Sequence, residues 1–275
     1  MAVAPYAMPA ERAWYYAHRV IVAAVLLFLI APILVIVPLS FNSEPYFTFP
    51  LPGVSLRWYE DFFTNDRWTL ALQTSIKVAA AVTILATALG TLAALGLSRA
   101  NFPARTIIMS LLISPMVVPV IISAVGMYFF YTRIGLSNSL PGLMLAHTAL
   151  ATPFVVIVVT ATLSGFDHSL VRAGASLGAT PTRVFFKVIL PLILPGVISG
   201  ALFACVTSFD EVVVVLFLAG PEQRTLPKQM FSGIREMISP TITAAATLLI
   251  LFAIAMLTTI ELLRRRSERL RGIRR

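Results

Sequence analysis

The sequence predicts an all-α membrane protein, a polytopic bundle of about six transmembrane helices. Apolar residues make up 58% of the 275 residues and charged residues only 12%, which is about half the charged fraction of a typical soluble domain. The mean hydropathy is +0.89. The apolar residues form runs of about 20 residues that do not alternate with polar ones, which favours helices over the strands of a membrane barrel.

Six runs are long enough to cross about 30 Å of hydrocarbon at about 1.5 Å per residue. We expect the first to be retained as a span, because it is too long for the core of a signal peptide. Pro115 and Pro119 remove two backbone hydrogen bonds from the third run and predict a kinked helix there. We treat residues 1–275 as one transmembrane domain with spans at residues 20–39, 76–97, 107–131, 140–163, 195–218 and 242–263.

The distribution of Lys and Arg predicts that both termini lie in the cytoplasm. Fourteen of the 21 basic residues fall on the side of the termini and of the loop 164–194, and seven fall on the other side. The basic tail, residues 264–275, supplies half of the cytoplasmic set, and without it the two sides carry seven each. The tail also explains most of the net charge of +9, which is typical of a topology anchor that meets anionic lipid. We therefore expect no nucleic-acid partner.

The loop 164–194 carries local signals for two short helices. Residues 170–177 can form the first helix, and Gly178 can end it because glycine accepts the left-handed conformation of a helix stop. Thr180 is a favoured N-cap, and Pro181 suits the first position of a second helix because it has no amide hydrogen to leave unpaired. The sequence thus predicts two cytoplasmic helices joined by a turn.

The second helix is expected to run to about residue 190, where Pro191 and Pro195 would break or kink it at the membrane. Phe185 and Phe186 offer apolar surface on this helix. Two interpretations stay open at this point. The loop either docks on a cytoplasmic partner or folds back on its own bundle.

Asp210 and Glu211 are carboxylates well inside the fifth run, where each costs about 2.5–3.5 kcal/mol on insertion scales. Asp210 shares a helical face with Phe203, Thr207 and Val214. One interpretation is a pathway that attracts a cationic solute, with Phe203 as a cation–π surface. The other is a structural role, in which the acids form hydrogen bonds to a neighbouring span or a partner subunit. The residues alone do not decide between them.

The longest outer segment, residues 41–74, is rich in aromatic side chains. An interfacial aromatic belt explains them, and so does a docking surface for an external partner. The two interpretations are compatible. The side chains concerned are Tyr46, Phe47, Phe49, Trp58, Tyr59, Phe62, Phe63 and Trp68.

One motif resembles a known family. The run Leu177-Gly178-Ala179, followed by Phe186, Ile189, Leu190-Pro191 and Pro195-Gly196, resembles the "EAA" loop of permease subunits in binding-protein-dependent ABC importers. In that family the loop is a coupling helix that sits in a cleft of the ATPase subunit. The family's Glu-Ala-Ala is Arg172-Ala173-Gly174 here, so the acid at the first position is missing. The resemblance implies that the coupling residues are Arg172, Ala173, Gly174, Leu177, Gly178, Ala179, Phe185 and Phe186.

Other segments are similar to the polyamine branch of this family, the permeases for spermidine and putrescine. The resemblance implies a fold like that of type I ABC importer permeases and a location in a bacterial inner membrane. It also implies three partners, namely a cytoplasmic ATPase dimer, a second permease subunit and a periplasmic solute-binding protein. The similar segments are Leu39-Ser40-Phe41-Asn42, Phe49-Pro50, Trp58-Tyr59, Ser208-Phe209-Asp210-Glu211-Val212, Phe217-Leu218, Leu226-Pro227 and Met230.

The sequence contains no Gly-x-x-x-x-Gly-Lys-Ser/Thr phosphate loop, no evident nucleophile–base pair and no Cys/His cluster. We therefore assign no catalytic residue and no metal ligand, and we expect energy for transport from outside the chain. The chain itself would bind no cofactor, and ATP and Mg would lie on the partner ATPase. Two alternatives remain: an ion-coupled secondary transporter or channel with Asp210 and Glu211 as a proton relay, and a membrane scaffold without transport.

Overall fold

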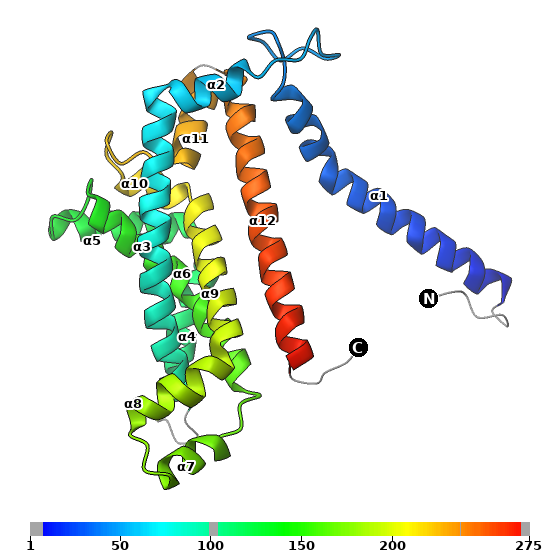
Figure 1. Cartoon of the computed structure of the whole chain (residues 1–275). Coiled ribbons are helices and arrows are strands. Elements are labelled where there is room, and N and C mark those ends of the chain that lie inside the picture. Colours follow the sequence, from blue (N-terminus) through cyan, green and yellow to red (C-terminus); the bar gives the residue numbers. More distant parts are fainter. Residues whose placement is uncertain (1–7, 99–103, 237, 271–275) are drawn as a thin grey trace.

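The computed structural model describes residues 8–98, 104–236 and 238–270 (Figure 1). Helices dominate these ranges, which contain no strand. In chain order they are α1 (Pro9–Leu39), α2 (Arg57–Thr64), α3 (Asp66–Leu97), α4 (Arg105–Val117), α5 (Val120–Arg133), α6 (Leu140–Leu163), α7 (Ser169–Ser176), α8 (Pro181–Val184), the π-helical turn η1 (Phe185–Ile189), α9 (Leu190–Asp210), α10 (Val213–Leu218), α11 (Leu226–Glu236) and α12 (Thr241–Leu270).

Five helices are long and apolar enough to cross a membrane, and α4 with α5 makes a sixth if this bent pair counts as one span. The expected number of about six is therefore confirmed. The five are α1, α3, α6, the continuous helix of α8, η1 and α9, and α12. Several helices also extend beyond the predicted spans; α3, for example, begins at Asp66, ten residues before the expected start.

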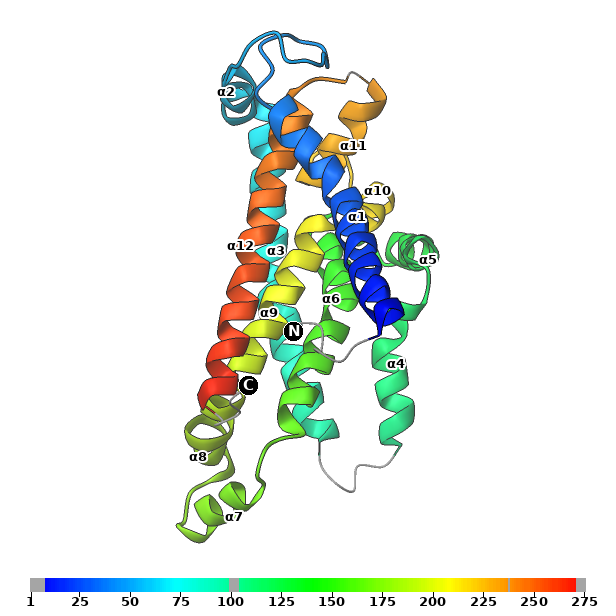
Figure 2. The same cartoon turned by 90° about the vertical axis from the view of Figure 1, so that its right-hand side faces the viewer.

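The centre of the bundle is the packing of α3, α6 and α9 (Figures 1 and 2). Glycines allow these backbones to approach closely. A Cβ atom added at Gly90 of α3 would lie 2.6 Å from Cβ of Val155 in α6, and one added at Gly200 of α9 would lie 3.2 Å from Cα of Val155. Small residues at such crossings are the usual device of membrane helices, since lipid supplies no hydrophobic force between them.

Helix α1 stands apart from this core. No residue of α1 is buried, although 31 residues form the helix. It contacts α12 and then diverges from the bundle (Figure 1). The start of α1 and the described end of α12 point toward the end of the molecule that carries α7 and α8, whereas α2 and α11 lie at the opposite end (Figures 1 and 2).

The third predicted span is bent by 102° between α4 and α5. The predicted kink is therefore confirmed, and it is located at Pro119, which caps α5. Val118 before it has extended backbone, with φ −70° and ψ 132°, because a following proline disfavours the helical conformation. Pro115 lies inside α4 without ending it.

The fifth predicted span, residues 195–218, is wrong as a continuous helix. Helix α9 ends at Asp210, Glu211 has extended backbone with ψ 119°, and α10 begins only at Val213. Of the expected break or kink at the prolines, a break is wrong, because one helix runs from Pro181 to Asp210 over 30 residues. The helix is bent, however, since α8 lies at an angle to α9 (Figure 1). The π-helical turn η1 lies between them, directly before Leu190 and Pro191. In this turn the Leu190 N–H donates to the Phe185 carbonyl. The backbone hydrogen bonds therefore already depart from the α-helical pattern just before Pro191, whose nitrogen has no hydrogen to donate.

Candidate functional site

The loop between α6 and α9 has a side-chain turn at Asp167, directly before α7, that was not predicted from the sequence. Asp167 precedes α7, and its carboxylate oxygens accept the Ser169 hydroxyl at 2.6 Å and the Ser169 N–H at 2.8 Å. These two hydrogen bonds lower the pKa of Asp167 from its usual value. An Asp two residues before a Ser is a recognisable local signal for such a turn. The carboxylate is thereby engaged within the start of α7.

The turn after α7 follows the predicted pattern closely. Gly178 has φ +78°, its N–H donates to the Ala175 carbonyl at 2.9 Å, and the Ala179 N–H donates to the Gly174 carbonyl at 3.1 Å. This pair of bonds is a Schellman motif, in which a left-handed residue satisfies the last carbonyls of a helix. The chain then enters α8, where the Thr180 hydroxyl accepts the Arg183 N–H at 3.4 Å.

The eight residues expected in the coupling loop divide between an outer and an inner side. Leu177 is 88% exposed and Phe186 is 58% exposed. Arg172, Ala173 and Gly178 are also exposed. The other three, Gly174, Ala179 and Phe185, are half-buried. A Cβ atom added at Gly174 would lie 3.2 Å from Cγ2 of Val184, so a glycine at this position lets α7 approach α8.

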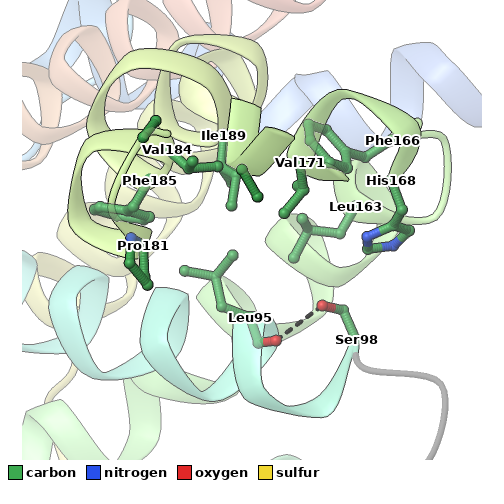
Figure 3. Close-up of a pocket in the computed structure, with 12 residues that line it drawn as sticks. Leu95, Ser98, Leu163, Phe166, His168, Val171, Pro181, Val184, Phe185 and Ile189 are labelled. Atoms are coloured by element: carbon green, nitrogen blue, oxygen red, sulfur yellow. Dashed lines mark hydrogen bonds between the residues drawn. The ribbon is translucent and has the colours of Figure 1, made fainter. Parts of the chain in front are cut away.

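A cavity of about 500 Å³ lies behind this loop, between it and the ends of α3 and α6 (Figure 3). Its walls are mainly apolar, and Phe185 points toward it while Phe166 and Val171 close another side (Figure 3). The space between loop and bundle is thus incompletely filled. The continuous helix from α8 through η1 into α9 connects the loop to the bundle.

That continuous helix joins the two sets of expected site residues. The loop lies at its start, and Asp210 is its last residue. The helix bends between α8 and α9 (Figure 1) but is continuous, so a displacement of α8 can be passed along its backbone toward Asp210.

The residues expected to line the pathway are only partly brought together. Asp210 is exposed, and its side chain makes no hydrogen bond or ion pair with any residue that the structure describes. Phe203 and Thr207 are half-buried on the same face of α9, and Phe203 stacks on Phe154 of α6 with ring centroids 6.5 Å apart. The expectation for Val214 is wrong, since the break after α9 turns it into the core at 0% exposure.

Glu211 differs from Asp210 in its surroundings. Its Oε1 accepts the Val214 N–H at 2.9 Å, so the carboxylate caps the start of α10 and interacts with the positive end of that helix. Asp210 lies at the opposite kind of helix end, where the last carbonyls of α9 carry partial negative charge. Of the two acids, Glu211 has the structural contact and Asp210 has the free carboxylate.

A buried polar pair beside this break was not anticipated. His147 of α6 is 1% exposed, and its Nδ1 lies 3.1 Å from Oγ of Ser208 in α9. The other ring nitrogen, Nε2, is buried without a partner among the described residues. Sequence separation hides such a pair, although a histidine within an apolar run is a signal for it. No group of three His, Cys, Asp or Glu that could hold a metal occurs in the described part of the chain.

Comparison with known proteins gives the family. The profile described as binding-protein-dependent transport system inner membrane component matches residues 86–271. The spermidine/putrescine transport system permease protein PotC of Haemophilus influenzae is 32% identical over 254 residues, which are 92% of this chain and 98% of the relative. The putrescine transport system permease protein PotI of Escherichia coli is 34% identical over 258 residues, which are 90% of this chain and 91% of the relative.

A solved structure supports the fold. A chain of a bacterial ABC transporter involved in the import of the acidic polysaccharide alginate matches with a TM-score of 0.75 at 15% identity, covering 94% of this chain and 99% of that one. At this identity the likeness concerns the fold and not the solute. From the matching profile and the two relatives, we conclude that the chain belongs to the family of binding-protein-dependent transport system inner membrane components, as a permease subunit of an ABC importer.

Proposed function

We propose that this permease forms the translocation pathway for a polyamine or a related cationic solute in a bacterial inner membrane. The names of the two relatives support this solute class. The structural observation that carries the proposal is the free carboxylate of Asp210 at the C-terminal end of α9. A carboxylate and helix-end carbonyls together attract a cation, and Phe203 and Thr207 on the same face add an aromatic ring and a hydroxyl.

The same proposal assigns partners to the two ends of the molecule. Both termini and the loop 164–194 lie in the cytoplasm, where the loop docks on an ATPase dimer that holds ATP and Mg. The end with α2 and α11 faces the periplasm and receives solute from a binding protein. A second permease subunit, identical or related, completes the pathway. The chain itself binds no cofactor and catalyses no reaction.

In this mechanism the loop and the pathway move as one body. Closure of the ATPase dimer on ATP displaces the exposed residues of the loop, which are Arg172, Ala173, Leu177, Gly178 and Phe186. The turn at Ala179 transmits this displacement to α8 and η1. The unbroken helix then carries the displacement to Asp210. The break between α9 and α10 is the point at which the pathway opens or closes, because the backbone there is extended.

An ion-coupled secondary transporter fits less well. A relay through Asp210 and Glu211 needs two exchangeable carboxyl groups, but Glu211 is engaged with the Val214 N–H. Family membership also favours the ATP-driven importer.

The test is uptake by proteoliposomes that contain the permease pair and its ATPase, with binding protein outside. We expect uptake of putrescine or spermidine, and a loss of about tenfold in Asp210→Asn, which corresponds to about 1.4 kcal/mol of lost attraction. Glu11→Gln is the matched control, since Glu11 is also an exposed carboxylate but lies in the first turn of α1, away from the end that receives solute. Equal uptake by Asp210→Asn and the wild type would contradict the role of Asp210, and no uptake of any polyamine would contradict the solute class.

A further inference from the structure

The coupling loop, residues 164–194, carries an excess of positive charge, three cationic side chains against one carboxylate. Residues 168–190 contain Arg172, Arg183 and Lys187 but no Asp or Glu. All three cations are exposed. None of them has a side-chain hydrogen bond or an ion pair to any residue within the described ranges. The one acid of the loop, Asp167, accepts two hydrogen bonds from Ser169 at the start of α7, and these bonds together with the nearby charge of Arg172 lower its pKa.

The same loop also exposes an apolar side chain, Leu177, at the turn between α7 and α8. Arg172 and Leu177 are exposed on α7 and the turn that follows it, while Val171 and Gly174 turn toward the cavity and α8. An exposed leucine with an exposed cation on the same short helix and turn suits an interface that combines an apolar anchor with polar edges.

The position of α7 argues against lipid as the occupant of this surface. Helix α7 lies beyond the ends of α3 and α6, at the extreme end of the molecule (Figures 1 and 2). Anionic headgroups flank the ends of the apolar spans and attract cations only within about a Debye length. Arg172 and Leu177 are exposed, and neither of them lines the cavity between the loop and the spans.

We infer that the ATPase cleft that receives this loop is acidic, with carboxylates placed around an apolar pocket for Leu177. The inference deepens the proposed function and rests on the docking of the loop on an ATPase. It adds the chemistry of the partner. An acidic cleft complements the three cations and accelerates encounter, and the resulting affinity depends on ionic strength because the loop is exposed.

The experiment measures binding of the cognate ATPase dimer to the full permease pair in nanodiscs of neutral lipid, at low and at high NaCl concentration. For the wild type we expect the Kd to rise at least tenfold with salt. For Arg172→Glu/Arg183→Glu we expect at least tenfold weaker binding at low salt and a lost or reversed salt dependence. The matched control is Arg67→Glu/Arg133→Glu, which makes the same change in charge at exposed positions outside the loop and should bind as the wild type does.

A third variant separates this inference from the proposed function. Leu177→Gln removes the apolar anchor without altering the charge of the loop. If Leu177→Gln binds the ATPase normally, the loop is not the docking surface and the proposed coupling fails. If Leu177→Gln loses binding but Arg172→Glu/Arg183→Glu keeps the affinity and salt dependence of the wild type, docking stands and the acidic cleft is refuted. A defect of the charge variant that appears only with anionic lipid would assign the cations to the membrane and also refute it.

Discussion

The turn at Gly178 offers the sharpest test of how the loop works. Its φ of +78° requires the left-handed region, and a Cβ atom added there would meet nothing within 4 Å. The cost of a side chain is therefore purely conformational, about 1–2 kcal/mol for alanine. Part of it is offset by about 0.4–1 kcal/mol from the lower entropy of the open chain. We expect a larger loss for valine, which is β-branched, and a smaller one for asparagine, which tolerates this conformation.

The assay is solute-stimulated ATP hydrolysis and uptake in proteoliposomes that contain the whole complex. Because about 1.4 kcal/mol is a factor of ten in an equilibrium, Gly178→Ala should lower coupling severalfold and Gly178→Val by more than tenfold, while Gly178→Asn stays near the wild type. Gly126→Ala is the control, since Gly126 also has open space but no positive φ. Full coupling in Gly178→Val, or an equal loss in Gly126→Ala, would refute this reasoning.

Three further changes test the bundle and the break after α9. Gly90→Ala should lower the melting temperature of the detergent-solubilised protein, because the added methyl group forces α3 away from α6 at a cost of about 1–3 kcal/mol. Adding Val155→Ala to the same chain should restore part of the lost stability. Glu211→Ala should lower the stability by about 1 kcal/mol, because α10 loses its cap. Thermal unfolding should therefore give Glu211→Ala a lower melting temperature than Glu211→Gln, and equal melting temperatures would contradict the role of the cap. His147→Leu should cost about 1–3 kcal/mol because Ser208 loses its partner, whereas His147→Asn should cost less, and the reverse order would be evidence against the pair.

Local chemistry explains what the sequence predicted well. The turn with Gly178, Thr180 and Pro181 depends on neighbouring residues only, so its left-handed glycine, its cap and its first helical proline could all be assigned in advance. The apolar runs likewise revealed the spans, because lipid demands helices of a certain length. The bend at Pro119 follows from the covalent geometry of proline.

The remaining features depend on contacts that no local pattern contains. The break after Asp210 has no glycine or proline to mark it, and the cap that Glu211 gives to α10 becomes visible only in the folded chain. Pro191 does not break its helix, and nothing in the local sequence marks the π turn that precedes it. The pair of His147 and Ser208 joins positions 61 residues apart.

The most direct measurement is uptake of labelled putrescine by proteoliposomes in which the permease pair is present either alone or with its ATPase and binding protein. If the loop between α6 and α9 couples transport to a separate ATPase, uptake requires all components and hydrolysable ATP, and deletion of residues 171–181 abolishes both ATPase association and uptake. Accumulation of solute by the permease pair alone, or undiminished uptake after that deletion, would contradict the mechanism proposed for this chain.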